Sequence, residues 1–88
     1  MIYKGVRFTK HAIEKLRILE KYGLKISLNT VINVVENPTR IDRRGKQYLA
    51  IKPLNESHAL RVVYEIRKGI KTVITLYPVR RKRYGIEG

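Results

Sequence analysis

Cysteine is absent from this 88-residue chain, and histidine occurs only twice, as His11 and His58. Without cysteine, neither a disulfide framework nor a thiolate metal site can form. Two isolated histidines do not make a zinc site either. We therefore expect a protein that works without a bound metal or cofactor.

Long apolar runs are also missing. No segment approaches the roughly 20 apolar residues that a membrane-spanning helix needs. The first charges, at Lys4 and Arg7, come before any apolar stretch that could form the core of a signal peptide. The sequence therefore predicts a cytoplasmic protein without a membrane partner.

Acidic side chains are scarce. Seven Asp and Glu face 20 Lys and Arg, which gives a net charge of +13. Such an excess opposes compaction by self-repulsion, so we expect an anionic partner. Residues 1–39 carry seven basic and three acidic side chains, whereas residues 40–88 carry thirteen and four. The basic excess therefore lies mainly in the second half of the chain.

Within that half, the basic residues cluster at positions 40–46 and 80–83. Clustering of this kind favours nucleic acid as the partner. An anionic membrane surface is a weaker alternative, because the chain has no basic amphipathic helix with an aromatic face. A generally basic, solvated surface and an acidic protein partner are the other interpretations.

The composition is that of a globular protein, with 43% hydrophobic and 31% charged residues. The chain has no internal repeat, low-complexity tract or linker. We expect one domain over residues 1–88.

The first half predicts a strand followed by a helix. Residues 2–8 alternate and are rich in β-forming side chains, which is typical of a strand. Thr9 suits the N-cap of a helix over residues 10–22, and Gly23 suits the position after its end.

A second helix is predicted through residues 31–35. Ser27 or Asn29 can cap it, and the pair Asn37-Pro38 ends it. The segment is rich in β-branched residues, so a strand is the alternative interpretation. The cap before it and the proline after it favour the helix.

The second half predicts strand after strand. A polar turn at residues 42–46 comes first, and the pair Lys68-Gly69 indicates a hairpin. The three predicted strands cover residues 48–52, 59–67 and 71–77, with a short extra strand at 40–42 as an option. The layout is β-α-α-β-β-β, an α+β fold with both helices on one face of a mostly antiparallel sheet. The other face would be partly open and basic.

Alternation is clearest in residues 59–67. One face of this strand would carry Leu60, Val62, Tyr64 and Ile66, and the other Arg61, Val63, Glu65 and Arg67.

Residues 59–84 hold the side chains best suited to nucleic-acid chemistry. Arg61 lies on the polar side of its strand, and a basic run follows the last strand. Arginines form bidentate hydrogen bonds to phosphate oxygens, and tyrosine rings stack on unpaired bases. This combination suits single-stranded RNA. The alternative is a solvated C-terminal tail. The run consists of Arg80, Arg81, Lys82 and Arg83, flanked by Tyr77 and Tyr84.

These residues resemble the RelE/ParE toxins of prokaryotic toxin–antitoxin systems. Residues 61–65 read R-V-V-Y-E, similar to the family's R-V-x-Y-E strand, and residues 80–84 are similar to its terminal H-R-R-x-x-Y-like segment. The chain resembles still more closely a set of small relatives with F-x-x-H-A, E-N-P and V-I-T-x-Y-P, which match residues 8–12, 36–38 and 73–78.

The resemblance implies a RelE/barnase-like fold and metal-free cleavage of mRNA, either on the ribosome or free. It also implies an acidic antitoxin protein as partner. Arg61 matches the strand arginine that stabilises the phosphate, and Arg80 or Arg81 matches the terminal arginine. Tyr84, or else Tyr77, would stack on a base or donate a proton.

His11 is the remaining catalytic candidate. It shares one edge of the first helix with Lys15 and could act as a general base near neutral pH. It could equally hydrogen-bond its own loop and anchor the helix.

The further residues expected to bind RNA are basic or aromatic: Lys15, Arg43, Arg44, Lys46, Tyr77, Lys82 and Arg83.

Two features separate the chain from the active toxins. Pro78-Val79 stands before Arg80 where many of them have a histidine, and Tyr84 falls close to the C-terminus. In addition, ParE-like members of the superfamily inhibit DNA gyrase instead of cutting RNA. Three functions therefore stay open: an endoribonuclease toxin, a non-catalytic RNA- or ribosome-binding module, and a toxin that acts by protein–protein contact.

Overall fold

The computed structural model describes residues 1–82, and its chain begins with a tight hairpin. Strand β1 (Ile2–Tyr3) pairs antiparallel with strand β2 (Val6–Phe8). Lys4 and Gly5 join them with φ angles of 51° and 81°, which are the signs that a type I′ turn requires. The single strand predicted over residues 2–8 is therefore wrong. A lysine in the left-handed region made the turn hard to foresee.

Helix α1 (Lys10–Lys21) begins and ends as its capping residues predict. The Thr9 Oγ1 atom accepts a hydrogen bond from the Ala12 amide at 3.2 Å and donates one to the Ile74 carbonyl at 3.1 Å. At the other end, Gly23 has a φ of 91°, and the Leu24 amide donates to the Leu19 carbonyl at 2.9 Å. The N-cap thus also ties α1 to the sheet.

Helix α2 (Leu28–Glu36) confirms the helical interpretation of the β-branched segment. Ser27 caps it, because its Oγ accepts a hydrogen bond from the Thr30 amide at 3.1 Å. Its apolar face is buried against the sheet, and this burial outweighs the weak helix propensity of β-branched residues. The buried residues are Val31, Val34 and Val35.

Six strands form one sheet in the order β1-β2-β6-β5-β4-β3. The strands not yet named are β3 (Arg40–Arg44), β4 (Gln47–Pro53), β5 (His58–Arg67) and β6 (Ile70–Arg80). The pair β2–β6 is parallel, and the other neighbours are antiparallel. The α+β class with two helices and a mostly antiparallel sheet is confirmed, whereas the predicted strand count is wrong.

Strand β3 explains part of that difference. It pairs with β4 over five residues, and the turn predicted for 42–46 shrinks to Gly45 and Lys46. All five residues of β3 are exposed. An edge strand with no buried side carries no hydrophobic alternation, so its sequence resembles a polar loop.

Strand β6 runs three residues beyond its predicted end and passes through Pro78. Strand β2 pairs with β6 only at Thr72 and Val73. Past this point the β2 side of β6 needs no ladder donor, so a proline is tolerated there.

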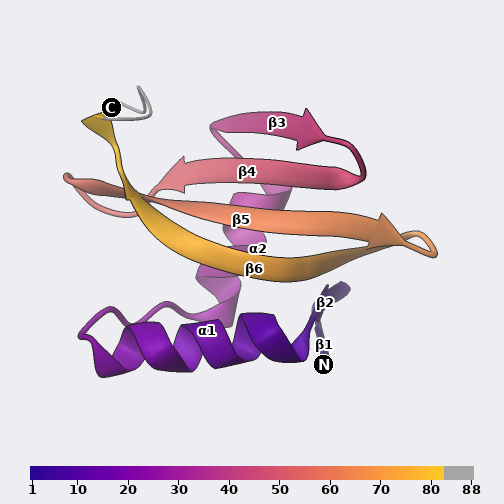
Figure 1. The fold of residues 1–88 in the computed structure, drawn as a ribbon, viewed down its shortest axis with the longest axis horizontal. Coiled ribbons are helices and arrows are strands. Elements are labelled where there is room, and N and C mark those ends of the chain that lie inside the picture. Colours follow the sequence, from indigo (N-terminus) through magenta and orange to yellow (C-terminus); the bar gives the residue numbers. More distant parts are fainter. Residues whose placement is uncertain (83–88) are drawn as a thin grey trace.

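Helices α1 and α2 pack into the same core against the sheet, since Ala12 of α1 and Val31 of α2 belong to one buried cluster, and Figure 1 shows how they are arranged. In that view α2 is behind β4 and β5, and α1 runs beside β6. We call the helix-covered side of the sheet the proximal face and the opposite side the distal face. The main core lies between the proximal face and the helices, and β5 contributes Leu60, Val62 and Tyr64 to it. The predicted alternation of β5 is confirmed, which leaves Arg61, Val63 and Glu65 on the distal face.

Neither helix of the described chain has the length and apolar character needed to cross a membrane.

Candidate nucleic-acid interface

The pair Arg61–Tyr77 occupies the middle of the distal face. Arg61 lies directly opposite Tyr77 on β6 and opposite Ile51 on β4. The Arg61 Nη1 atom donates a hydrogen bond to the Tyr77 hydroxyl at 3.5 Å. Both side chains are half-buried. The structure therefore presents a cation and a phenol side by side on two adjacent strands.

An apolar cluster adjoins this pair. Ile51 is 1% exposed and Ala59 is fully buried, and Val79 packs against them. Ala59 and Val79 face each other across β5 and β6, two residues along from Arg61 and Tyr77. A guanidinium beside apolar side chains is less hydrated than one on an open surface, which strengthens its attraction for an anion.

The basic residues at the end of β6 do not form one cluster with Arg61. Arg80 is exposed and lies opposite His58, and strand alternation places it on the other face from Tyr77. Arg81 instead stabilises the β4–β5 turn, because its Nη1 donates to the Asn55 carbonyl at 2.8 Å. Its backbone amide donates to the Ser57 carbonyl at 3.1 Å. Lys82, the last described residue, is exposed.

Arg83 and Tyr84 lie outside the described residues. The roles expected for them therefore rest on the sequence alone. Among residues 1–82, Tyr77 is the tyrosine that contacts Arg61.

His11 and Lys15 lie on α1, near the edge of β6. His11 is exposed and Lys15 is half-buried. The N-cap of α1 is hydrogen-bonded to β6 at Ile74, which is three residues, or about 10 Å, from Tyr77 along the strand. The structure thus brings the start of α1 to the same strand as Tyr77, and His11 remains separate from the Arg61–Tyr77 hydrogen bond.

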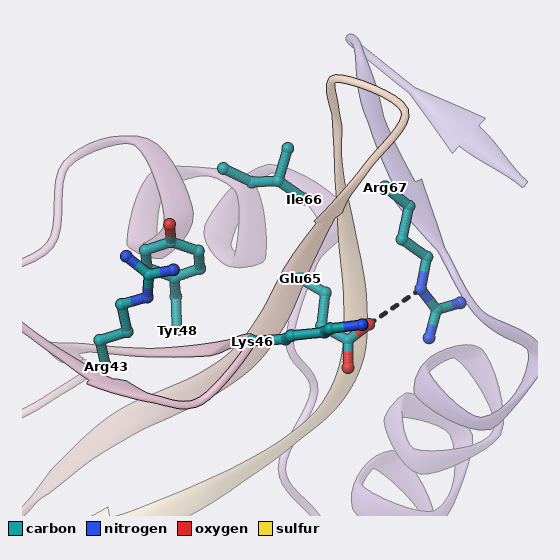
Figure 2. Close-up of a pocket in the computed structure, with 6 residues that line it drawn as sticks. All are labelled: Arg43, Lys46, Tyr48, Glu65, Ile66 and Arg67. Atoms are coloured by element: carbon teal, nitrogen blue, oxygen red, sulfur yellow. Dashed lines mark hydrogen bonds and ion pairs between the residues drawn. The ribbon is translucent and has the colours of Figure 1, made fainter.

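The predicted RNA-binding residues Arg43, Arg44 and Lys46 belong to the β3–β4 hairpin, and β3 forms the edge of the sheet opposite β1. Arg44 is exposed on the outermost strand. Arg43 and Lys46 line a notch of about 490 Å³ between this hairpin and the β5–β6 hairpin (Figure 2). The remaining residues of the notch are Tyr48, Glu65, Ile66 and Arg67. These four were not predicted as site residues, because only strand pairing brings the two hairpins together.

A row of stacked side chains crosses the sheet beside the notch, on its proximal face. The Arg43 guanidinium lies 5.3 Å from the centroid of the Tyr48 ring. The Tyr48 and Tyr64 rings are stacked with centroids 5.2 Å apart and an interplanar angle of 14°. The Lys71 ammonium lies 5.8 Å from the Tyr64 centroid. Each cation thus sits against the face of an aromatic ring, which is favourable for both partners.

Burial raises the pKa of the Tyr64 hydroxyl, and the negative charge that Tyr48 or Glu36 can carry raises it further. Tyr64 therefore stays protonated at neutral pH and serves the core.

No cluster of three or more His, Asp or Glu side chains suited to a metal ion occurs within residues 1–82.

Comparisons with protein-family models, with curated proteins and with solved structures find no match to this chain.

Proposed function

We propose that this protein is a RelE/ParE-like toxin that cleaves RNA at the Arg61–Tyr77 pair. The observation that supports this most strongly is the half-buried guanidinium at the centre of the distal face, hydrogen-bonded to a tyrosine on the next strand. The net charge of +13 adds a general attraction for a polyanion. Arg61 is also the residue that matches the family's strand arginine.

The proposed reaction is an internal phosphoryl transfer. The ribose 2′-oxygen forms a bond to the adjacent phosphorus, and the bond from phosphorus to the 5′-oxygen breaks. A base takes the proton from the 2′-hydroxyl, and an acid gives a proton to the leaving 5′-oxygen. The products are a 2′,3′-cyclic phosphate and a free 5′-hydroxyl.

Arg61 would act on the phosphorane, where negative charge builds up on the non-bridging oxygens. A cation fixed before the reaction stabilises that charge without having to reorganise. Tyr77 orients Arg61 and is the described phenol best placed to exchange a proton with the substrate. His11, which the sequence suggested as a base, lies on α1 and apart from the Arg61–Tyr77 hydrogen bond, so we assign it no step in the reaction.

An RNA-binding module without catalysis is the second candidate. It is favoured by the contacts of the terminal arginines, because Arg81 is hydrogen-bonded to Asn55 and Arg80 lies on the other face from Tyr77. In both readings the basic surface would also suit an acidic antitoxin protein.

The deciding experiment is RNA cleavage by the wild type and by Arg61→Ala, without divalent metal and with translating ribosomes in a parallel reaction. We expect cuts that end in a 2′,3′-cyclic phosphate, and a rate about 100-fold or more lower in Arg61→Ala. RNA affinity should fall only about fivefold at 0.1 M salt, since one phosphate contact is lost.

Arg17→Ala is the matched control, because it removes the same charge from an exposed position on α1. It should cleave at nearly the wild-type rate. A wild type that binds RNA and leaves it intact would instead support the binding module, and equal losses of rate in both variants would rule out a special role for Arg61.

A further inference from the structure

The notch between the two hairpins arises from unequal strand lengths. Strand β4 begins at Gln47, opposite Glu65. The β5–β6 hairpin continues for two more residue pairs, so Ile66 and Arg67 project beyond the start of β4. The β3–β4 turn at Gly45 and Lys46 lies beside this projection (Figure 2). The recess thus lies at the end of the sheet, where Arg43 and Tyr48 line it from the proximal side and Glu65 and Arg67 line it from the distal side (Figure 2).

Arg43 is held in position at this notch although its strand is exposed. Its Nε donates a hydrogen bond to the Gly45 carbonyl at 3.2 Å, and its guanidinium rests against Tyr48. The other face of Tyr48 is supported by the stacked ring of Tyr64. The Nη groups of Arg43 can then meet a phosphate with little loss of side-chain entropy, which favours binding.

Glu65 gives the notch a hydrogen-bond acceptor among cations. Its Oε1 atom accepts from the Arg67 Nε at 3.0 Å, and its side chain is 22% exposed. Arg43, Lys46 and Arg67 outnumber it, so the lining keeps a net positive charge. A site for phosphate alone needs no carboxylate, whereas a carboxylate accepts hydrogen bonds from the exocyclic amine of a base.

Glu65 also shares the distal face with Arg61. The two are four residues apart on β5, or about 13 Å. At a stacked rise of about 3.4 Å, roughly four nucleotides span this distance. One RNA strand can therefore occupy both places.

We propose that the notch is a subsite for one nucleotide of the RNA, in which Arg43 and Lys46 hold the phosphate and Glu65 accepts a hydrogen bond from the base. This inference rests on the proposed function, because it needs RNA as the ligand. It adds a prediction about specificity, since a uracil has no exocyclic amine to donate to Glu65.

The first test measures binding of labelled single-stranded RNA to Arg43→Gln/Lys46→Gln. Lys21→Gln/Lys25→Gln is the control, as it removes the same charge from exposed positions around the end of α1. With a 12-nucleotide RNA at 0.1 M salt, the notch variant should bind about fivefold more weakly or worse, and the salt slope should fall by about 0.7.

The second test compares oligo-C with oligo-U. We expect the wild type to prefer oligo-C by about tenfold, the worth of a hydrogen bond to a charged group. Glu65→Gln should lose most of this preference, because an amide can donate to uracil as well as accept from cytosine. The ratio of the two affinities is the readout, since the substitution also changes the net charge.

The outcomes separate the two proposals. If the wild type binds 12-nucleotide RNA and the notch and control variants weaken it equally, the subsite is wrong and the proposed function stands. A C-to-U ratio unchanged by Glu65→Gln would also contradict the role of Glu65. If the wild type does not bind RNA at all, the proposed function fails and the subsite fails with it. Folding of each variant is checked by its circular dichroism.

Discussion

Two tyrosines on adjacent strands show how differently the two faces of the sheet are used. Tyr64 lies on the proximal face, is 4% exposed and stacks on Tyr48. Tyr77 lies on the distal face, is half-buried, and its hydroxyl accepts a hydrogen bond from Arg61. The proximal ring contributes burial to the core, whereas the distal ring keeps its polar end next to a cation.

This contrast indicates that strand alternation separates the main core from the face that carries Arg61 and Tyr77. Side chains that point toward the helices join the main core. The distal face combines a small apolar cluster, formed by Ile51, Ala59 and Val79, with charged residues. Substitutions on the two faces should therefore affect different measurements.

The largest expected effect is on stability. Tyr64→Ala should lower the free energy of unfolding by about 3–5 kcal/mol, because it removes a buried ring and leaves a cavity. Tyr77→Ala should lower it by only about 1 kcal/mol, since its ring is half-buried. Urea denaturation followed by circular dichroism measures both. Equal losses would mean that the distal face contributes to the fold as much as the proximal one.

The next effect is on cleavage. Tyr77→Phe removes only the hydroxyl that accepts from Arg61, and we expect the cleavage rate to fall about tenfold. Tyr64→Phe keeps the stacked ring and should cleave at the wild-type rate. Initial rates with saturating RNA are compared for the two variants. A slow Tyr64→Phe enzyme, or a fast Tyr77→Phe enzyme, would break the proposed division between the faces.

The smallest effect concerns alkaline pH. The pKa of Tyr64 is raised by burial, so its proton is held more tightly in the folded than in the unfolded chain. This contribution to stability is complete below the unfolded pKa of about 10 and is lost as the pH rises through the folded pKa. The wild type should therefore lose more stability than Tyr64→Phe between neutral pH and values above 10. Parallel urea titrations at each pH give the comparison, and identical pH profiles would contradict it.

Some parts of this fold follow directly from local sequence. Thr9 and Ser27 mark the starts of the two helices, because each side-chain oxygen satisfies an amide that the helix leaves unpaired. The alternation of β5 is equally local, since successive side chains of a strand point to opposite faces. Alternation alone therefore places Arg61 on the polar side of its strand, without any knowledge of the neighbouring strands.

Other parts depend on neighbours that are distant in the sequence. The turn of the β1–β2 hairpin needs a positive φ at Lys4. Lysine rarely adopts this conformation, so the residue type does not predict the turn. Strand β3 is exposed throughout, so pairing with β4, rather than burial, makes it a strand. Neither feature leaves a hydrophobic pattern to read.

The sequence by itself determined the strongly basic charge, the α+β class and the side of β5 on which Arg61 lies, because composition, capping and alternation are local properties. Only the tertiary structure decided which residues meet. It pairs Arg61 with Tyr77, ties Arg81 to Asn55 and forms a notch from two hairpins. The physical reason is strand register, which is set by the packing of the whole sheet against its helices and which brings together residues that are far apart along the chain.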